Sequence, residues 1–225
     1  GFGFGLTHKA PWPRKGHEID RGADALEAHG IPVPDRIPRL PLMTPERSVA
    51  ARLLGRGPVV AIHVGAGNAV KRWMPDRFAA VAAALSRRAR VAVLAGPDEV
   101  ITGAQVARVV PRGRLIDLRG KLTLGQMAAV IARADVFIGT DGGAGHVAAA
   151  VGAPSVIVFS GTSLASEWAP RGRRVTVLER QVPCKPCHST WCPYGQECLR
   201  RVSVADVLAA TTRLLNKSQS PRRAA

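Results

Sequence analysis

Short apolar runs alternate with helical patterns along most of this chain, and this alternation limits the folds that it can adopt. The apolar runs are rich in Val and Ile and lie at residues 58–64, 90–95, 135–139 and 154–159, with weaker ones at 114–118 and 173–178. The helical patterns lie at residues 75–88, 98–110, 123–133, 143–152 and 203–215. Strands that alternate with helices of this length form βαβ units. We therefore predict an α/β fold, a Rossmann-like parallel sheet with helices on both faces.

The composition agrees with a buried parallel sheet. Aromatic residues make up 4% of the chain against 46% for all apolar types, so the core must be built mainly from Ala, Val, Leu and Ile. No apolar run approaches the roughly 20 residues that a membrane span needs, and the N-terminus lacks a signal-peptide pattern. From these features we expect a soluble, cytoplasmic protein.

The N-terminal part of the chain differs from the rest. Residues 1–16 are rich in Gly and Pro, and residues 17–30 have a helical pattern. Residues 31–46 contain five prolines and are expected to be extended. Thr44 is expected to cap the first helix of a compact domain. We divide the chain into an irregular and helical segment with a Pro-rich linker, a Rossmann-like domain and a disordered tail, at residues 1–43, 44–216 and 217–225.

A glycine-rich, basic loop follows the first predicted strand. It has the sequence HVGAGNAVKRW, in which Gly65 and Gly67 let the backbone approach a ligand closely and Lys71 adds a positive charge. The helix predicted from Pro75 directs its amide groups toward the same place. These features predict a phosphate-binding loop. The alternative is an ordinary glycine-rich loop with solvated basic residues.

Two carboxylates follow the second predicted strand, in the sequence LAGPDEV. Asp98 and Glu99 begin the next helix, where carboxylates commonly act as caps and dipole partners. In dinucleotide-binding folds an acidic residue binds ribose hydroxyls. Both roles stay open at this point, and capping is the commoner one.

The strand predicted at 135–139 runs into the sequence GTDGGAGHVAAAVGAP. Its glycines remove side chains from the start of a helix, so that free N–H groups and the helix dipole face an anion. Asp141 can accept hydrogen bonds from sugar hydroxyls. His146 can donate to a phosphate, although a lone histidine is more often a packed structural residue. Two anion-binding loops at one edge of a sheet predict a diphosphate ligand.

All four cysteines lie within the sequence CKPCHSTWCPYGQEC, with the spacing C-x2-C-x4-C-x5-C. Thiolates grouped in this way can surround Zn or Fe tetrahedrally. Free thiols in a packed loop are a second reading, and two local disulfides are a third that a reducing cytosol disfavours. The candidate metal ligands are Cys184, Cys187, Cys192 and Cys198.

The chain is strongly basic, with 32 Lys and Arg against 16 Asp and Glu and a formal net charge of +16. Such a charge favours an anionic partner: nucleic acid, a membrane surface or phosphorylated small molecules. A solvated arginine-rich surface is the alternative. Nucleic acid is not expected, because the cysteine segment has few aromatic residues and no recognition-helix pattern.

Taken together, the segments HVGAGNAVKRWMPDRF, LAGPDEV, LRGKLTLGQMAAVIARADVFIGTDGGAGH and the cysteine block resemble the ADP-heptose:lipopolysaccharide heptosyltransferases, glycosyltransferase family 9, in order and spacing over roughly residues 17–215. The resemblance implies a GT-B fold of two Rossmann-like domains. The chain matches the C-terminal, donor-binding half. By this resemblance we expect the N-terminal acceptor domain, which contains the family's catalytic base, to be largely absent from this chain, so no catalytic residue is assigned here.

The resemblance also implies roles for particular residues. Lys71 would contact the donor diphosphate, Asp141 the transferred sugar, Leu122 the adenine, and Asp98 or Glu99 the ribose. The remaining donor-binding positions are backbone and turn residues beside the phosphates: Gly65, Ala66, Gly67, Gly142, Gly143, Ala144 and His146. Two departures stand out, since Gly142 replaces the usual Ser or Thr and FSGT replaces a Gly-Pro-Thr sequence.

The implied function is inverting transfer of heptose or a related sugar from an ADP-sugar, with no cofactor for catalysis. The acceptor would be an anionic lipopolysaccharide core or a similar molecule, with peripheral contact to the inner membrane. A non-catalytic nucleotide-sugar-binding module is the alternative. A third reading is a protein heptosyltransferase of the autotransporter-modifying branch, which has an iron-bound four-cysteine site. A missing N-terminal domain or a partner chain would supply the base, and this chain alone would then be inactive.

Overall fold

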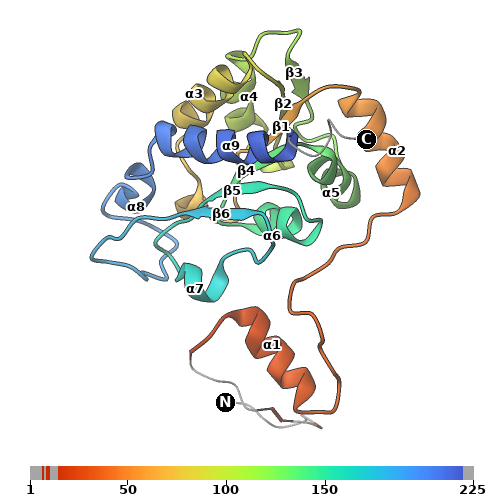
Figure 1. Ribbon diagram of the computed structural model, residues 1–225. Coiled ribbons are helices and arrows are strands. Elements are labelled where there is room, and N and C mark those ends of the chain that lie inside the picture. The colour runs from red at the N-terminus through yellow and green to blue at the C-terminus, as the bar shows by residue number, and fades with distance from the viewer. Residues whose placement is uncertain (1–6, 8, 11–14, 220–225) are drawn as a thin grey trace.

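The computed structural model describes residues 7, 9–10 and 15–219. Its centre is a six-stranded, fully parallel sheet with the strand order β3-β2-β1-β4-β5-β6 (Figure 1). The order reverses between β1 and β4, which is the Rossmann arrangement and confirms the predicted fold class. The strands are β1 Val59–His63, β2 Arg90–Leu94, β3 Leu115–Asp117, β4 Val136–Thr140, β5 Ser155–Val158 and β6 Val175–Leu178.

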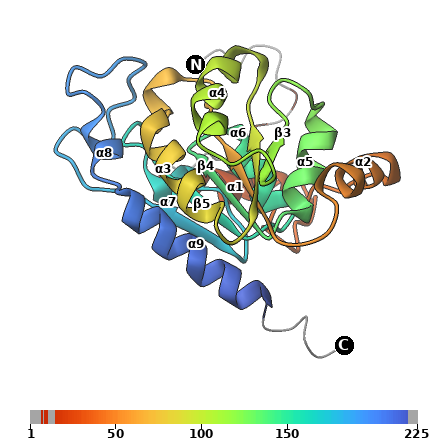
Figure 2. The same cartoon turned by 90° about the horizontal axis from the view of Figure 1, so that it is seen from above.

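Helices cover both faces of the sheet, because successive strand residues point to opposite sides. In β1, Val60 and Ile62 pack in one core cluster with α3, α4 and α9, whereas Val59 and Ala61 pack in another with α2, α5 and α6. Figure 2 shows α9 beside α3. The helices are α1 Glu18–Glu27, α2 Thr44–Leu54, α3 Pro75–Leu85, α4 Val100–Arg108, α5 Leu124–Arg133, α6 Gly143–Ala150, α7 Ala165–Trp168, α8 Glu197–Arg200 and α9 Val204–Gln219.

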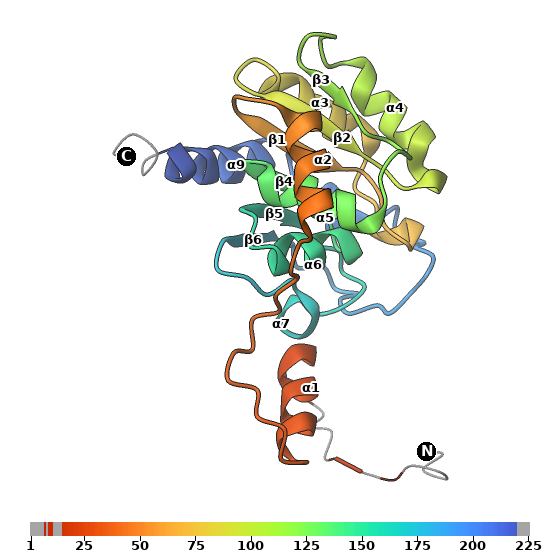
Figure 3. The same ribbon diagram turned by 90° about the vertical axis from the view of Figure 1, so that its right-hand side faces the viewer.

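The N-terminal segment lies outside the sheet and its helical layers. Helix α1 lies beside α7, and an extended linker leads from it to α2 (Figures 1 and 3). The linker is attached to the domain where the Leu40 N–H donates to the Ala150 carbonyl at 3.0 Å. The Pro-rich sequence thus forms the extended connection that was predicted.

Two predicted boundaries differ from the structure. Thr44 is the first residue of α2, and the cap is Met43, which makes no side-chain hydrogen bond. Helix α9 continues through Gln219, beyond the predicted domain boundary at residue 216. The predictions for residues 1–6, 8, 11–14 and 220–225 lie outside the described residues.

Candidate functional site

The two glycine-rich loops meet at the point where the strand order reverses. Thr140, at the end of β4, donates its hydroxyl to the Gly65 carbonyl at 2.8 Å. A Cβ built on Gly142 would lie 3.6 Å from the Ala66 Cβ. The loops are therefore in direct contact, as expected for neighbouring parallel strands.

A lysine and an aspartate face each other across this junction. Lys71 ends the short 3₁₀ helix η1, Ala69–Lys71, and its Nζ lies 3.3 Å from Asp141 Oδ2. Asp141 is only 3% exposed, and its N–H donates to the Val158 carbonyl at 3.0 Å. Burial of a carboxylate needs a charged or hydrogen-bonding partner, and Lys71 supplies one. The structure thus brings together two residues that the sequence assigned to the diphosphate and the sugar.

Two hydroxyls that sequence reasoning did not single out complete the surroundings of Asp141. Ser160 donates to Asp141 Oδ2 at 2.8 Å, and its Oγ lies 2.8 Å from the Thr162 hydroxyl. Both side chains are buried. The sequence did contain a signal for Ser160. The sequence FSGT stands where the family usually has Gly-Pro-Thr, and this difference introduces Ser160 next to β5.

The second strand end holds Glu99 and Asp98 in different environments. Glu99, in the 3₁₀ helix η2 (Pro97–Glu99), is 8% exposed and accepts a hydrogen bond from the Gly96 N–H at 3.0 Å. Its carboxylate also lies 3.6 Å from the Arg72 guanidinium. Asp98 is exposed. Glu99 therefore binds the β1 and β2 loops in this structure, and Asp98 keeps its carboxylate in solvent.

Glu99 also occupies the space beside Gly65. A Cβ built on Gly65 would lie 1.9 Å from the Glu99 Cδ, so a side chain there would displace the carboxylate. His63 also lies near this carboxylate. Its Nε2 is 3.9 Å from Glu99 Oε2, and its Nδ1 accepts a hydrogen bond from the Gly65 N–H. Burial holds the pKa of His63 below its ordinary value, although Glu99 opposes the shift. A neutral His63 thus acts here as an acceptor for the loop.

The start of α6 presents backbone N–H groups to the same crevice. Gly142 is the N-cap residue and makes no side-chain cap, while Gly143 is exposed and Ala144 half-buried. His146 lies at the surface of this first turn, and partial desolvation lowers the pKa of its imidazole, with Asp141 acting in the opposite direction. Uncapped N–H groups at a helix N-terminus form an anion site.

Leu122 lies farther along the same edge, after β3. It is half-buried and packs against the core cluster that contains α5. Two cavities of about 790 and 630 Å³ lie at the opposite edge of the sheet, and none of the predicted donor residues lines either one. We therefore place the candidate site where charged side chains and backbone N–H groups meet at the strand ends, and not in either of these cavities.

The cysteine segment lies beside β5 and contains free thiols. The Gly161 N–H donates to Cys198 Sγ, and the Gln196 N–H donates to Cys192 Sγ, each at 3.3 Å. Cys184 and Cys187 are exposed. Burial raises the pKa of Cys198 above its ordinary value. The donors fit a thiolate-binding metal chemically, but among the described residues no three His, Cys, Asp or Glu side chains are arranged to hold an ion.

The sheet order, with glycine-rich loops at its switch point, defines a Rossmann-like α/β domain. Glycosyltransferase family 9 (heptosyltransferase) matches residues 5–197 of the chain. The chain belongs to this family, as the sequence motifs predicted. Lipopolysaccharide heptosyltransferase 3 of Escherichia coli is 30% identical over 172 residues, which is 71% of this chain and 47% of that protein. The chain thus spans about half the length of this curated relative.

Solved structures agree on the fold. The glycosyltransferase family 9 protein of Veillonella parvula DSM 2008 has a TM-score of 0.79 and 23% identity, over 93% of this chain and 62% of that one. TibC of enterotoxigenic E. coli H10407 is an iron-containing, dodecameric heptosyltransferase, solved in complex with ADP-D-β-D-heptose. That complex has a TM-score of 0.55 and 22% identity, over 73% of this chain and 47% of that one. In the part of the chain that the structure describes, no helix is both long and apolar enough to span a membrane.

Proposed function

We propose that this chain binds an ADP-sugar across the ends of β1 and β4, as the donor-binding half of a heptosyltransferase. The observation that supports this most directly is the 3.3 Å contact between Lys71 and Asp141, which joins the two glycine-rich loops. Family membership and the ADP-D-β-D-heptose complex of TibC support the choice of nucleotide and sugar.

The groups at this edge match the parts of such a donor. The N–H groups of Gly143 and Ala144 and the Lys71 ammonium would bind the diphosphate, whose negative charge grows as the sugar leaves. Asp141 would accept hydrogen bonds from the sugar hydroxyls, with Ser160 holding its carboxylate in place. In the ligand-free chain Lys71 and Asp141 neutralise each other, so a bound diphosphate competes for Lys71.

Complete sugar transfer needs a base that removes the acceptor's proton. The family resemblance assigns this base to an N-terminal domain, and we propose that such a domain or a partner chain provides it. The acceptor in this proposal is a lipopolysaccharide core or a similar anionic molecule, met at the inner membrane. A nucleotide-sugar-binding module without catalysis is the alternative, and sugar transfer with and without an added N-terminal half separates the two.

A structural metal is a second part of the proposal. Backbone N–H groups donate to the sulfurs of Cys192 and Cys198, an arrangement that suits thiolate ligands. Zn or Fe held by the four cysteines would cross-link the segment after β6 without taking part in the transfer. Elemental analysis of the protein purified without chelators tests this, with Cys192→Ser as the variant that should lose the metal. A metal-free wild-type protein with full thermal stability would contradict it.

Calorimetric titration with ADP, UDP and GDP tests the donor site. We expect ADP to bind, and Lys71→Ala to weaken binding by about 10- to 100-fold, because a hydrogen bond to a charged group contributes about 1.5–3 kcal/mol. Arg88→Ala is the matched control, since it removes one positive charge from an exposed residue between α3 and β2. Equal weakening by both variants would attribute binding to net charge rather than to the site.

A further inference from the structure

Helix α1 is attached to the Rossmann-like domain by polar contacts more than by apolar packing. Ala23 is buried, whereas Leu26 is 46% exposed. By contrast, His17 and Arg21 are 8% and 7% exposed, which is unusual for such polar side chains. The attachment of α1 should therefore depend on these polar contacts.

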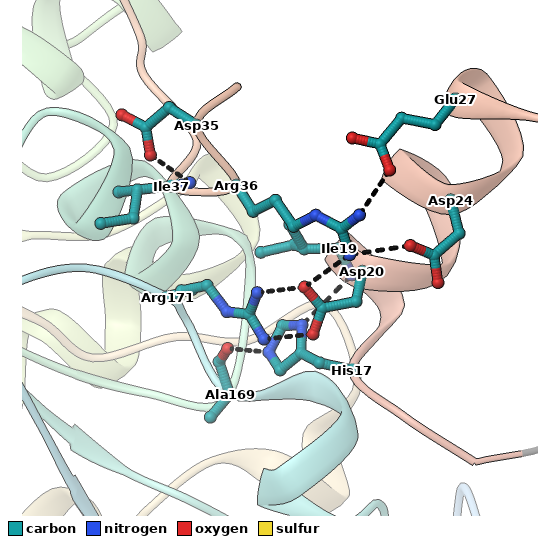
Figure 4. Close-up of polar contacts among 10 residues, drawn as sticks. All are labelled: His17, Ile19, Asp20, Asp24, Glu27, Asp35, Arg36, Ile37, Ala169 and Arg171. Carbon is teal, nitrogen blue, oxygen red and sulfur yellow. Dashed lines mark hydrogen bonds and ion pairs between the residues drawn. The ribbon is translucent and has the colours of Figure 1, made fainter. Parts of the chain in front are cut away.

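Asp20 is at the centre of these contacts (Figure 4). Its two carboxylate oxygens accept parallel hydrogen bonds from the Arg171 guanidinium, at 2.6 and 2.7 Å. The same carboxylate lies 3.6 Å from Arg36 of the linker. Arg36 in turn binds Asp24 at 2.8 Å and Glu27 at 2.6 Å. One aspartate thus connects the helix, the linker and the domain. Bidentate pairs of this kind are the strongest and most directional among ion pairs.

His17 adds a second attachment close to the first. Its Nε2–H donates to the Ala169 carbonyl at 2.8 Å, and its Nδ1 accepts the Ile19 N–H as the N-cap of α1. Both ring nitrogens are therefore occupied by the protein. Since Ala169 and Arg171 flank Pro170, α1 binds one short segment at both of its ends.

That segment lies directly against α6. A Cβ built on Gly145 would lie 3.3 Å from Pro170 Cγ, and one built on Gly172 would lie 3.3 Å from the Ala149 Cα and Cβ. The segment 169–172 is thus a layer between α1 and α6, and its Pro170 contacts the turn that follows Gly142 and Gly143. The charges of Asp141 and Lys71 act on His146 in this turn.

We propose that Asp20 is a positioning residue for the donor site: by binding Arg171 and Arg36 together it docks α1 on segment 169–172, and this segment holds the first turn of α6 in place. The inference rests on the proposed function, since it takes that turn as the diphosphate-binding element. Asp20 itself does not contact the donor in this scheme.

The test compares Asp20→Asn with Asp35→Asn in the full chain. Asp35 is a matched control, because it pairs with Arg39 at 2.6 Å within the linker, whereas Arg171 binds Asp20. Hydrogen exchange is measured over α1 and over residues 143–146, together with the dissociation constant for ADP. We expect Asp20→Asn to speed exchange about two- to fivefold in both segments and to weaken ADP binding about two- to fivefold, with Asp35→Asn close to wild type.

A spectroscopic readout separates positioning from general loss of stability. Loss of support for the first turn of α6 changes the surroundings of the His146 ring, whose pKa is lowered mainly by desolvation, so the pKa of His146, followed by NMR, should rise toward its ordinary value in Asp20→Asn and stay unchanged in Asp35→Asn. Arg171→Lys, which keeps the charge but loses the paired bonds, should give an intermediate result, and it replaces Asp20→Asn if that variant does not fold.

Two outcomes would overturn the inference. One is unchanged exchange in α1 of Asp20→Asn. The other is an undocked α1 with unchanged exchange in residues 143–146 and an unchanged His146 pKa. If the wild-type chain does not bind ADP, the proposed function fails, whereas the exchange and NMR results still decide whether Asp20 positions α6.

Discussion

Replacing Gly65 with alanine should destabilise the protein through one identifiable contact. The added Cβ would lie about 1.9–2.0 Å from the Cδ, Oε1 and Oε2 atoms of Glu99, a distance that real atoms do not adopt. Glu99 must then turn away. It loses its hydrogen bond from the Gly96 N–H and its approach to Arg72. Backbone strain does not contribute, because the φ of Gly65 is not in the left-handed region.

The size of the effect follows from these losses. Removing a hydrogen bond to a charged group costs about 1.5–3 kcal/mol, and the exposed end of η2 allows part of the carboxylate's hydration to return. We therefore expect Gly65→Ala to lower the free energy of unfolding by about 2 kcal/mol, measured by urea denaturation. Gly67→Ala is the control, since no atom lies within 4 Å of a Cβ built there, and it should change stability by less than about 0.5 kcal/mol.

A double-mutant cycle makes this explanation refutable. A Glu99→Ala variant lacks the carboxylate that the new Cβ would meet. Adding Gly65→Ala to that variant should therefore change the free energy of unfolding little, and the effects of the two substitutions should be strongly non-additive. If Gly65→Ala costs as much without Glu99 as with it, the contact is not the cause.

Two further expectations concern Asp141 and Asp20. Ser160→Ala removes a buried hydrogen bond to Asp141 at 2.8 Å, so it should cost about 1–2 kcal/mol of unfolding free energy and weaken ADP binding, whereas Ser189→Ala in the cysteine segment should leave ADP binding unchanged. The paired bonds from Arg171 lower the pKa of Asp20 to about 2 from 3.8, so its contribution is fully present above pH 3.8 and is lost as the pH falls toward 2. Because Asp20 is 33% exposed, this contribution should stay below about 1 kcal/mol. Acid unfolding curves of wild type and Asp20→Asn should therefore differ near neutral pH and converge near pH 2, and a constant difference down to pH 2 would contradict the assignment.

Much of the fold was predictable because its determinants are local. Val and Ile runs predicted the strands to within one or two residues, and the helical pattern at 123–133 matches α5, whose cap Thr123 accepts the Gln126 N–H. Helix ends were less predictable. Thr44 lies inside α2, with Pro45 as the second residue, where the missing N–H of proline is one of the groups that a helix start leaves unbonded.

The candidate site was predictable in part. Glycine and charge at the strand ends pointed to Lys71 and Asp141, which the structure places in contact. The orientation of Glu99 toward Gly65 was not predictable, because Asp98 and Glu99 are chemically equivalent in the sequence and only the packing of η2 separates them. Ser160 was also missed as a partner of Asp141, because its hydroxyl reaches the site only through the neighbouring strand β5.

The sequence by itself determined the alternation of strands and helices, the glycine-rich loops at the strand ends and the family. These are properties of short segments, in which periodicity and residue type decide the conformation. The tertiary structure alone decided that β4 lies next to β1, so that Lys71 meets Asp141, and that Asp20 meets Arg171 across 151 residues of chain. Contacts between such distant residues depend on the order of strands and on the space left between packed layers, which no local pattern specifies.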